Sequence, residues 1–516
     1  MDIFTNLWDG AVFALSFGNI VAIVLGYMVG VIAGSIPGIM AVTAMVLILP
    51  FTFGMEPLFA ISLLMGCYKG GAYAGSITAT LFNIPGTPEA AATCIEAYPM
   101  TLRGEEARAL EISLWASVFG GMVSNFLLIF TAPPLSAIAL KLGPAEVAAL
   151  ILFSLTAVIS LLGESRMDIW KGFIAVSVGL MIAIIGLDSM TTTRRFVFGM
   201  SELDNGITFI VAIISLLALS EVFLQVENTG EFHKLKRTEL SDTKKYTFSQ
   251  RWKDFKFTLV DLLRSSFLGS LLGALPGIGA TTASLVSYGE SRRAAKEPSM
   301  FGNGDPRGIA ASESGNNAVA ASSLIPLITL GIPGSVAAAV MFGAFMVQGM
   351  IPGPMLMQEH PEIIYGLFVI LIVTDILGAF LVALPYIALV RRLFKTLDYT
   401  LLFPGVIVCC TVGVYSEEFD PFGLKVMLML GFLGYLMKKA RFSIPPLILA
   451  FILGPILERN TRTALLIGGG SPMVFVKSPI ALSLLVLTGL SLFWAVWKKR
   501  KKKDRFIDDI ELPPGH

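Results

Sequence analysis

The sequence predicts an all-α polytopic membrane protein with two inverted repeats and paired discontinuous or re-entrant helices. Three observations lead to this fold class: the composition, the long apolar runs, and glycine–proline motifs that occur twice in the same order. Of the 516 residues, 55% are hydrophobic and 15% are charged, and the mean hydropathy is +0.76. Because soluble domains usually carry about 25% charged residues, the composition excludes an ordinary water-soluble protein.

The apolar residues occur in runs long enough to cross a bilayer. Clear runs lie at 12–32, 127–159, 207–224, 363–390 and 480–497. A helix of about 20 apolar residues spans the hydrocarbon core, and we expect about 10 to 14 spans in total. The first run has no basic leading segment and no small-x-small cleavage site, so we expect it to remain as a span.

Basic residues gather in two segments that we expect to be cytoplasmic. Residues 233–256 contain eight lysines and arginines, and residues 498–503 are all basic. The positive-inside rule assigns both segments to the cytoplasm, whereas the N-terminal segment, with Asp2 and Asp9 and no basic residue, is expected outside. A tail that binds nucleic acid is the alternative, but a basic segment after a last span is far commoner, so no nucleic-acid partner is expected.

These assignments divide the chain into five parts. They are a first membrane repeat at 1–230, a cytoplasmic basic linker at 231–257, a second membrane repeat at 258–477, an extra transmembrane helix at 478–497 and a basic cytoplasmic tail at 498–516. With the N-terminus outside and the linker inside, the first repeat crosses the membrane an odd number of times. The second repeat then starts on the opposite side, which predicts inverted repeats.

Two pairs of motifs indicate the duplication. Residues 30–38, ending in Pro37-Gly38, match residues 269–277, ending in Pro276-Gly277, at an offset of 239. Residues 83–87 (Asn-Ile-Pro-Gly-Thr) match residues 331–335 (Gly-Ile-Pro-Gly-Ser) at an offset of 248. Proline lacks an amide hydrogen and glycine weakens a helix, so each Pro-Gly pair is expected to break a helix inside an apolar run.

Broken helices at membrane depth are typical of transport sites. Exposed backbone groups are tolerated there only inside the protein or beside a wet cavity. The partial charges of the helix ends can then hold an organic anion and a small cation side by side. The alternative is a set of kinks without a role in binding. Elsewhere, Gly120-Gly121 and Gly431-x-x-Gly434 predict close helix packing.

The residues around the second pair of breaks are the candidate contacts to solute or ion. They are Ser76, Thr78, Asn83, Pro85, Gly86, Thr87, Glu313, Asn316, Asn317, Thr329, Pro333, Gly334 and Ser335. A sodium ion is expected near Asn316 and Asn317, because hard cations prefer oxygen ligands. Glu313 either belongs to this site or lies in a watery loop. Lys69 is either functional, as intramembrane charges often are, or snorkels to the membrane interface.

Several blocks of the sequence resemble the large membrane subunit (TctA type) of the tripartite tricarboxylate transporters, from about residue 18 to residue 480. The blocks lie at 34–38, 73–77, 83–86, 273–280, 301–304, 312–318, 330–335, 352–354, 412–415 and 453–458. Departures from the family pattern are Ser312, where proline is frequent, the segment 96–99, and Lys69 in a stretch that tends to be uncharged.

The resemblance implies a secondary transporter for a small carboxylate, such as a tricarboxylate, in a bacterial inner membrane. It implies two protein partners, a small four-span membrane subunit and a periplasmic solute-binding protein that delivers the solute. Symport with an ion, commonly sodium, is expected, and no other cofactor. The departures leave the solute open, so citrate is not assumed.

Two other classes of function are weighed against transport. A membrane-embedded enzyme acting on lipid-linked substrates would need a catalytic pair within the membrane, and the sequence contains no such motif. An ion channel would normally place a filter on the axis of a symmetric oligomer, whereas this chain has paired breaks within one polypeptide. We therefore expect a transporter and no enzymatic activity.

The topology is testable by cysteine labelling. In a background without the four native cysteines, single cysteines at Lys244 and Lys501 are expected to resist an impermeant thiol reagent in intact cells. Both should react once the membrane is permeabilised. Reaction of both from outside in intact cells would overturn the assignment.

Overall fold

The computed structural model of the chain describes residues 3–36, 40–162, 166–188, 190–227, 246–277, 279–393, 402–418 and 420–501. These residues are mostly helical, with one two-stranded antiparallel hairpin of β1 (Gly186–Leu187) and β2 (Arg194–Arg195). Among them, four helices are long and apolar enough to cross a membrane, and six shorter apolar helices accompany them. The predicted all-α membrane fold is confirmed at this level.

The chain forms two compact units, and each unit takes segments from both sequence halves. Unit 1 comprises Met1–Lys141 and Ile207–Lys439, and unit 2 comprises Leu142–Gly206 and Ala440–His516. The units therefore do not coincide with the repeats expected at 1–230 and 258–477. A duplicated sequence need not pack copy by copy, and here residues 142–206 of the first half and residues 440–516 of the second half belong to the same unit.

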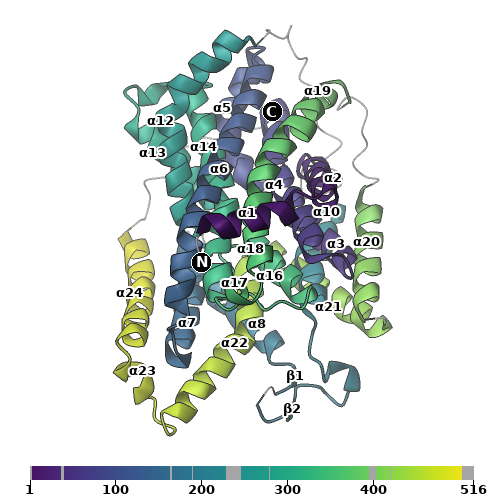
Figure 1. The fold of residues 1–516 in the computed structure, drawn as a ribbon, viewed down its shortest axis with the longest axis vertical. Helices are drawn as coiled ribbons and strands as arrows, with labels where there is room; N and C mark the ends of the chain where they lie inside the picture. Colours follow the sequence, from purple (N-terminus) through teal and green to yellow (C-terminus); the bar gives the residue numbers. More distant parts are fainter. Residues whose placement is uncertain are drawn as a thin grey trace. The chain divides into compact units, whose positions relative to one another are not determined.

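Unit 1 contains most of the helices (Figure 1). From the first half come α1 (Ile3–Ala14), α2 (Phe17–Gly34), α3 (Ala41–Ile48), α4 (Pro57–Phe82), α5 (Ala91–Leu102), α6 (Glu106–Ala139), α9 (Phe209–Ile213) and α10 (Ser220–Glu227). From the second half come α12 (Phe248–Gly273), α13 (Gly279–Ala294), α14 (Pro306–Ser322), α15 (Leu324–Leu330), α16 (Val336–Val347), α17 (Leu356–Glu359), α18 (Pro361–Leu377), α19 (Leu384–Leu393), α20 (Leu402–Glu418) and α21 (Pro421–Lys439). Helices α9 and α10 are joined by a π-helical turn, Ile214–Leu219, and α18 and α19 by another, Gly378–Ala383.

Glycines on α2 let its backbone touch that of α4. A side chain on Gly30 would overlap the carbonyl oxygen of Cys67, and one on Gly34 would overlap that of Gly71. Glycines four residues apart on one helix face allow such approach, which stabilises helix pairs in membranes through close packing. The middle of the long helix α4 is therefore held directly against α2.

The same contact recurs between α12 and α14, which lie side by side with α13 (Figure 1). A side chain on Gly269 would overlap the carbonyl oxygen of Gly315. Gly269 matches Gly30 at the offset of 239, and Gly315 matches Cys67 at the offset of 248. The two sequence halves thus form equivalent helix pairs, with the backbones in contact at equivalent positions.

Helix α6 packs closely against second-half helices on two sides. A side chain on Gly120 would overlap the carbonyl oxygen of Ser314 in α14, and one on Gly121 would lie 2.6 Å from the carboxylate of Asp375 in α18. Gly431 and Gly434 of α21 similarly lie against Leu219 and Ser220. The close packing predicted for these two glycine pairs is confirmed.

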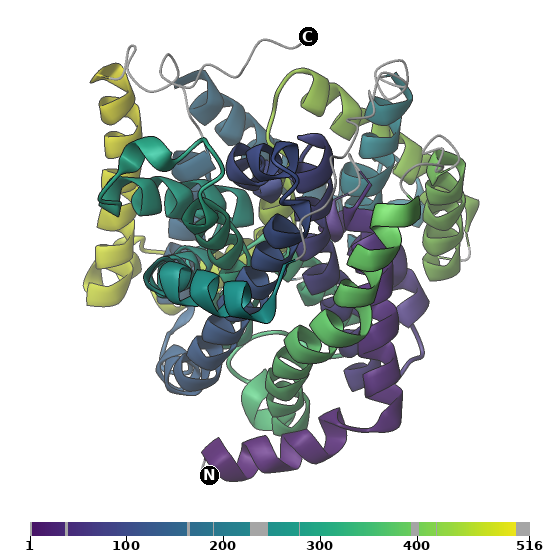
Figure 2. The same ribbon diagram turned by 90° about the horizontal axis from the view of Figure 1, so that it is seen from above.

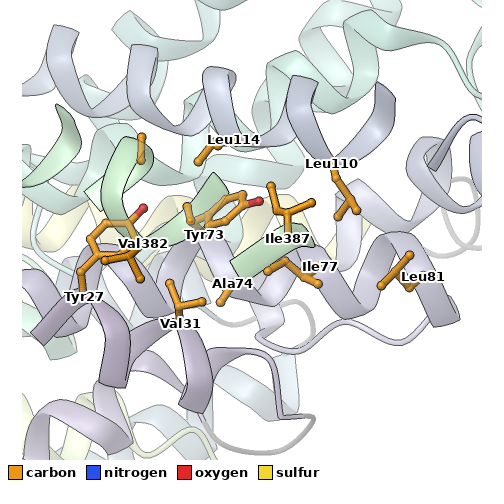
Figure 3. Close-up of a cluster of buried hydrophobic side chains, with 12 residues drawn as sticks. Tyr27, Val31, Tyr73, Ala74, Ile77, Leu81, Leu110, Leu114, Val382 and Ile387 are labelled. Atoms are coloured by element: carbon orange, nitrogen blue, oxygen red, sulfur yellow. The ribbon is translucent and has the colours of Figure 1, made fainter. Parts of the chain in front are cut away.

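An apolar cluster fills the space between α2, α4, α6 and the segment that follows α18 (Figure 3). Tyr27 and Val31 come from α2, Tyr73 and Ile77 from α4, and Leu114 from α6. In the same unit α1 packs against α18 and runs across the direction of most neighbouring helices (Figures 1 and 2).

Unit 2 consists of α7 (Pro144–Leu162), α8 (Arg166–Ala183), the β-hairpin, α22 (Pro445–Ile467), α23 (Met473–Lys477) and α24 (Pro479–Lys501). Helix α8 packs on α22, where a side chain on Gly179 would overlap the carbonyl oxygen of Leu447. An ion-pair network ties the hairpin region to α22, with Arg462 bound to Asp188 at 2.7 Å and Arg195 bound to Glu458 at 2.8 Å. The predicted extra helix at 478–497 corresponds to α24.

A buried carboxylate joins α5 to the loop before α14. Glu96 accepts hydrogen bonds from the backbone N–H groups of Gly302 (2.5 Å), Gly304 (2.7 Å) and Asp305 (2.8 Å) and from the hydroxyl of Tyr288 (2.9 Å). Asp305 in turn is the N-cap residue of α14. A first-half side chain therefore fixes the start of a second-half helix.

The glycine contacts predict a clear stability difference. Gly30→Ala and Gly269→Ala are expected to lower the free energy of unfolding by about 1–3 kcal/mol, because the added methyl group overpacks a backbone contact. Gly18→Ala is the control, since its nearest neighbour would be 3.7 Å away. Thermal unfolding of the purified protein in detergent measures the effect, and equal stability of all three variants would contradict the packing argument.

The Glu96 contacts predict a second difference. In Glu96→Gln an amide NH₂ replaces one acceptor oxygen and faces backbone donors, so buried N–H groups lose their partner at about 1–3 kcal/mol. Glu290→Gln removes only a partly exposed ion pair with Arg293 and is expected to cost about 0–1 kcal/mol. Melting temperatures and proteolysis of the loop at 298–305 would show the difference. A Glu96→Gln protein as stable as Glu290→Gln would contradict it.

Candidate functional site

The Pro-Gly motifs lie where helices end. Residues 83–87 connect α4 to a short 3-10 turn before α5, and residues 331–335 connect α15 to α16. The preceding helices end in the same way, with Asn83 (φ 57°) and Gly331 (φ 71°) in the left-handed conformation. Pro276 and Gly277 likewise separate α12 from α13, whereas Pro37 and Gly38 lie outside the described residues.

The two breaks of the second half lie next to each other, and in the first half the described residues near the breaks make a similar contact. In the second half, the N–H group of Gly277 donates to the carbonyl oxygen of Gly334 at 2.9 Å. In the first half, a side chain on Gly86 would overlap the carbonyl oxygen of Gly34. A side chain on Gly334 would likewise lie 2.8 Å from the carbonyl oxygen of Ser323. Backbone atoms thus fill the space beside Gly86 and Gly334, so protein packing itself requires glycine at both positions.

A buried polar cluster surrounds Glu313 in the middle of α14. One carboxylate oxygen of Glu313 accepts from Thr93, and the other accepts from Ser117 of α6 at 3.0 Å. The amide of Asn317 donates to Ser117 at 2.9 Å and also to the side-chain oxygen of Asn316. Glu313 is 0% exposed, so the watery-loop interpretation is wrong.

Two serines of α6 extend this cluster to α4. The Ser117 hydroxyl, which donates to Glu313, also lies 2.9 Å from the carbonyl oxygen of Ser113, and the Ser113 hydroxyl donates to the Ser76 hydroxyl at 2.6 Å. The predicted residues Ser76, Glu313, Asn316 and Asn317 therefore belong to one hydrogen-bonded chain. Its members come from α4, α6 and α14, helices of both halves.

The other predicted polar residues make local contacts. Thr78 donates to the carbonyl oxygen of Gly75 (3.4 Å) and Thr329 to that of Ile325 (2.7 Å). Ser335 donates to Ser323 (3.1 Å) and caps the start of α16. Thr87 is buried against Gly75.

Sequence reasoning missed Thr93, Ser113 and Ser117. The two serines stand four residues apart in an apolar helix, so they share one face of α6, and this spacing was a usable signal. Thr93 lies in a mixed segment without such a pattern. Its approach to Glu313 depends on a contact between residues 220 positions apart in the chain.

A second buried polar cluster lies around Lys69. The Lys69 ammonium donates to Asp375 (2.7 Å), to the carbonyl oxygen of Leu371 (3.0 Å) and to Asn125 (3.2 Å). The Lys69 and Asp375 side chains are 4% and 7% exposed. The snorkelling interpretation of Lys69 is wrong, because its charge is paired inside unit 1.

Unit 1 also contains a mostly apolar cavity of about 390 Å³ between α6, α12 and the π-helical turn that follows α18. Trp115, Phe255 and Leu262 line it, with Arg251 and Asp254 among the charged lining residues. None of the predicted site residues lines this cavity. Among the described residues, no three His, Cys, Asp or Glu side chains group as metal ligands.

Comparison with known proteins agrees with the transporter resemblance. The profile of the tripartite tricarboxylate transporter TctA family matches residues 20–449. A 52.8 kDa Agrobacterium vitis protein from the TAR-I ttuC′ 3′ region is 36% identical over 487 residues, which cover 94% of this chain and 95% of that protein. A second protein of that organism, from the TAR-II ttuC′ 3′ region, is 39% identical over 243 residues, 47% of this chain and all of its own length.

No solved structure matches the chain. The family match nevertheless covers most of the sequence, and it includes α2 to α6, α12 to α16 and the buried clusters around Glu313 and Lys69. The chain is therefore a multi-pass membrane protein that belongs to the TctA family of tripartite tricarboxylate transporter subunits.

Proposed function

We propose that this subunit carries a small carboxylate, such as a tricarboxylate, across a bacterial inner membrane together with sodium. The observation that supports the proposal most strongly is the environment of Glu313. Among the described residues, no lysine or arginine forms an ion pair with this fully buried carboxylate, and its partners are hydroxyl groups. A charged group buried in this way is costly unless another charge compensates it.

A bound monovalent cation would supply that compensation. The Glu313 carboxylate, the Ser117 hydroxyl and the Asn316 side-chain oxygen lie within one hydrogen-bonded cluster. Carboxylate, hydroxyl and amide oxygens are the ligand types that hard cations prefer. An ionisable group inside a membrane segment is also a functional candidate by default.

Paired breaks and matched contacts support an inverted-repeat transporter. The helix pairs α2–α4 and α12–α14 use equivalent glycines, and Asn83 and Gly331 end equivalent helices with the same left-handed conformation. An odd number of spans in the first half would invert the second copy. Such an arrangement suits alternating access to a site between the repeats.

The proposed partners are a small four-span membrane subunit and a periplasmic solute-binding protein that delivers the carboxylate. In the proposed assembly the N-terminus is periplasmic, and the central linker and the tail are cytoplasmic. Adjacent genes for a secreted binding protein and a small four-span protein would support this assembly. A channel would instead conduct ions without the binding protein.

Variants of the Glu313 cluster test the coupling. Asn317→Ala is expected to raise the sodium concentration for half-maximal uptake by about tenfold, which corresponds to about 1.4 kcal/mol. Glu313→Gln keeps the shape and removes the charge, so it is expected to abolish most sodium dependence. Uptake into vesicles that hold the complete transporter, with binding protein present and a controlled sodium gradient, measures both.

Two exposed or partly exposed positions provide matched controls. Asn303→Ala and Glu290→Gln repeat the same chemical changes away from the cluster and are expected to leave sodium dependence unchanged. If Asn317→Ala and Glu313→Gln also transport with the parent sodium dependence, the coupling role of this cluster is wrong, and the residues only stabilise the helix packing.

A further inference from the structure

We propose that the Lys69 ammonium permanently occupies a monovalent-cation site in the first half, equivalent in place to the exchangeable site around Glu313 in the second. The inference rests on the proposed function for its second site. Its own basis is the geometry around Lys69 and the match between the two halves.

Three oxygen atoms around Lys69 accept hydrogen bonds from its ammonium group, one for each N–H donor. An ammonium group has three N–H donors, and Lys69 directs them to a carboxylate, an amide and a main-chain carbonyl, from Asp375, Asn125 and Leu371. These are also ligand types of hard cations. The Asn125 amide donates to the same Asp375 oxygen at 2.8 Å, so the carboxylate and the amide hold each other in place.

The position of Lys69 in the repeat is informative. The offset of 248 that matches Asn83 with Gly331 and Gly86 with Gly334 also matches Lys69 with Asn317. Lys69 lies in the middle of α4, which ends at a break, and Asn317 lies in α14, which is followed by the short helix α15 and then by the equivalent break. Both also contact a long helix of the opposite half, since Lys69 binds α18 and Asn317 binds α6.

The two equivalent positions differ by one positive charge. Asn317 is uncharged and lies near Glu313, a buried carboxylate that forms no ion pair with the described lysines and arginines. Lys69 is charged and neutralises Asp375 at 2.7 Å. One half therefore contains its own cation, whereas the carboxylate of the other half is left to be neutralised by a cation or a proton from solution.

Stability alone is a weak explanation for the Lys69 pair. Replacing a buried ion pair by apolar residues is often neutral or stabilising, so such a pair is poor evidence of a purely structural role. The pair also lies close to the proposed coupling site. Asn125 and Ser117 are eight residues apart on α6, which is about 12 Å along a helix.

A fixed cation lowers the number of ions that each transport cycle carries. A protein with exchangeable ions at both positions would move one more cation per solute than this protein does. Lys69 is therefore a determinant of coupling stoichiometry, and its removal should convert its oxygen cage into a working sodium site.

The test compares three full-length proteins: the parent, Lys69→Ala and Lys69→Ala/Asp375→Asn. Sodium binding to each purified protein is measured with radioactive sodium, and thermal unfolding is followed as sodium chloride replaces N-methylglucamine chloride. Lys69→Ala is expected to bind one more sodium per chain than the parent and to be stabilised more by added sodium. The double variant lacks the carboxylate charge and should bind no extra sodium.

Reconstituted transport gives a second readout. The sodium-to-solute ratio of Lys69→Ala is expected to exceed the parent ratio by one, which a purely structural lysine would not change. Equal sodium binding by Lys69→Ala and the parent would overturn the proposal. So would a Lys69→Ala protein that fails to fold even at high sodium.

The inference about Lys69 and the coupling role of Glu313 can fail independently of each other. If the parent binds no sodium, coupling at Glu313 fails, yet a gain of one sodium in Lys69→Ala would still identify the cage around Lys69. If the parent binds sodium and Lys69→Ala gains none, the Lys69 inference alone fails.

Discussion

Contact between helix backbones at Gly30 and Gly269 sets the distance of α2 from α4 and of α12 from α14. In a membrane the lipid chains are as apolar as the side chains, so helices associate through close packing rather than through burial from water. With no side-chain layer between the paired backbones, α4 and α14 lie deep in unit 1. Their polar residues, including Lys69 and Glu313, consequently meet α6 and α18 instead of lipid.

The two halves are joined crosswise rather than placed side by side. Helix α14 of the second half binds α6 of the first through Ser117, and α4 of the first half binds α18 of the second through Asp375. Helix α6 takes part in both contacts, because it also provides Asn125. A rigid α6 would therefore connect the proposed exchangeable cation site to the site that Lys69 fills.

Local sequence patterns predicted the helices and breaks of this fold better than the contacts between them. Apolar runs and Pro-Gly pairs predicted the membrane helices and the breaks at residues 85–86 and 333–334, because both effects act within a few residues. The position of Glu313 beside Asn317 follows from helical spacing. The partners Thr93 and Asp375 could not be predicted, since their contacts join residues 220 and 306 positions apart and depend on how the two halves cross. The grouping of residues 142–206 with residues 440–516 in one unit escaped prediction for the same reason.

The ion pair between Lys69 and Asp375 also constrains how the chain is made. Asp375 is synthesised 306 residues after Lys69, so α4 leaves the ribosome long before its counter-charge exists. A lysine at the centre of an inserting helix costs about 2.5–3.5 kcal/mol on insertion scales. Until α18 arrives, α4 must either remain beside the insertion machinery or keep its ammonium hydrated. Assembly of the first half therefore cannot finish before the second half has entered the membrane, and a chain truncated before α18 would present an unpaired charge to cellular quality control.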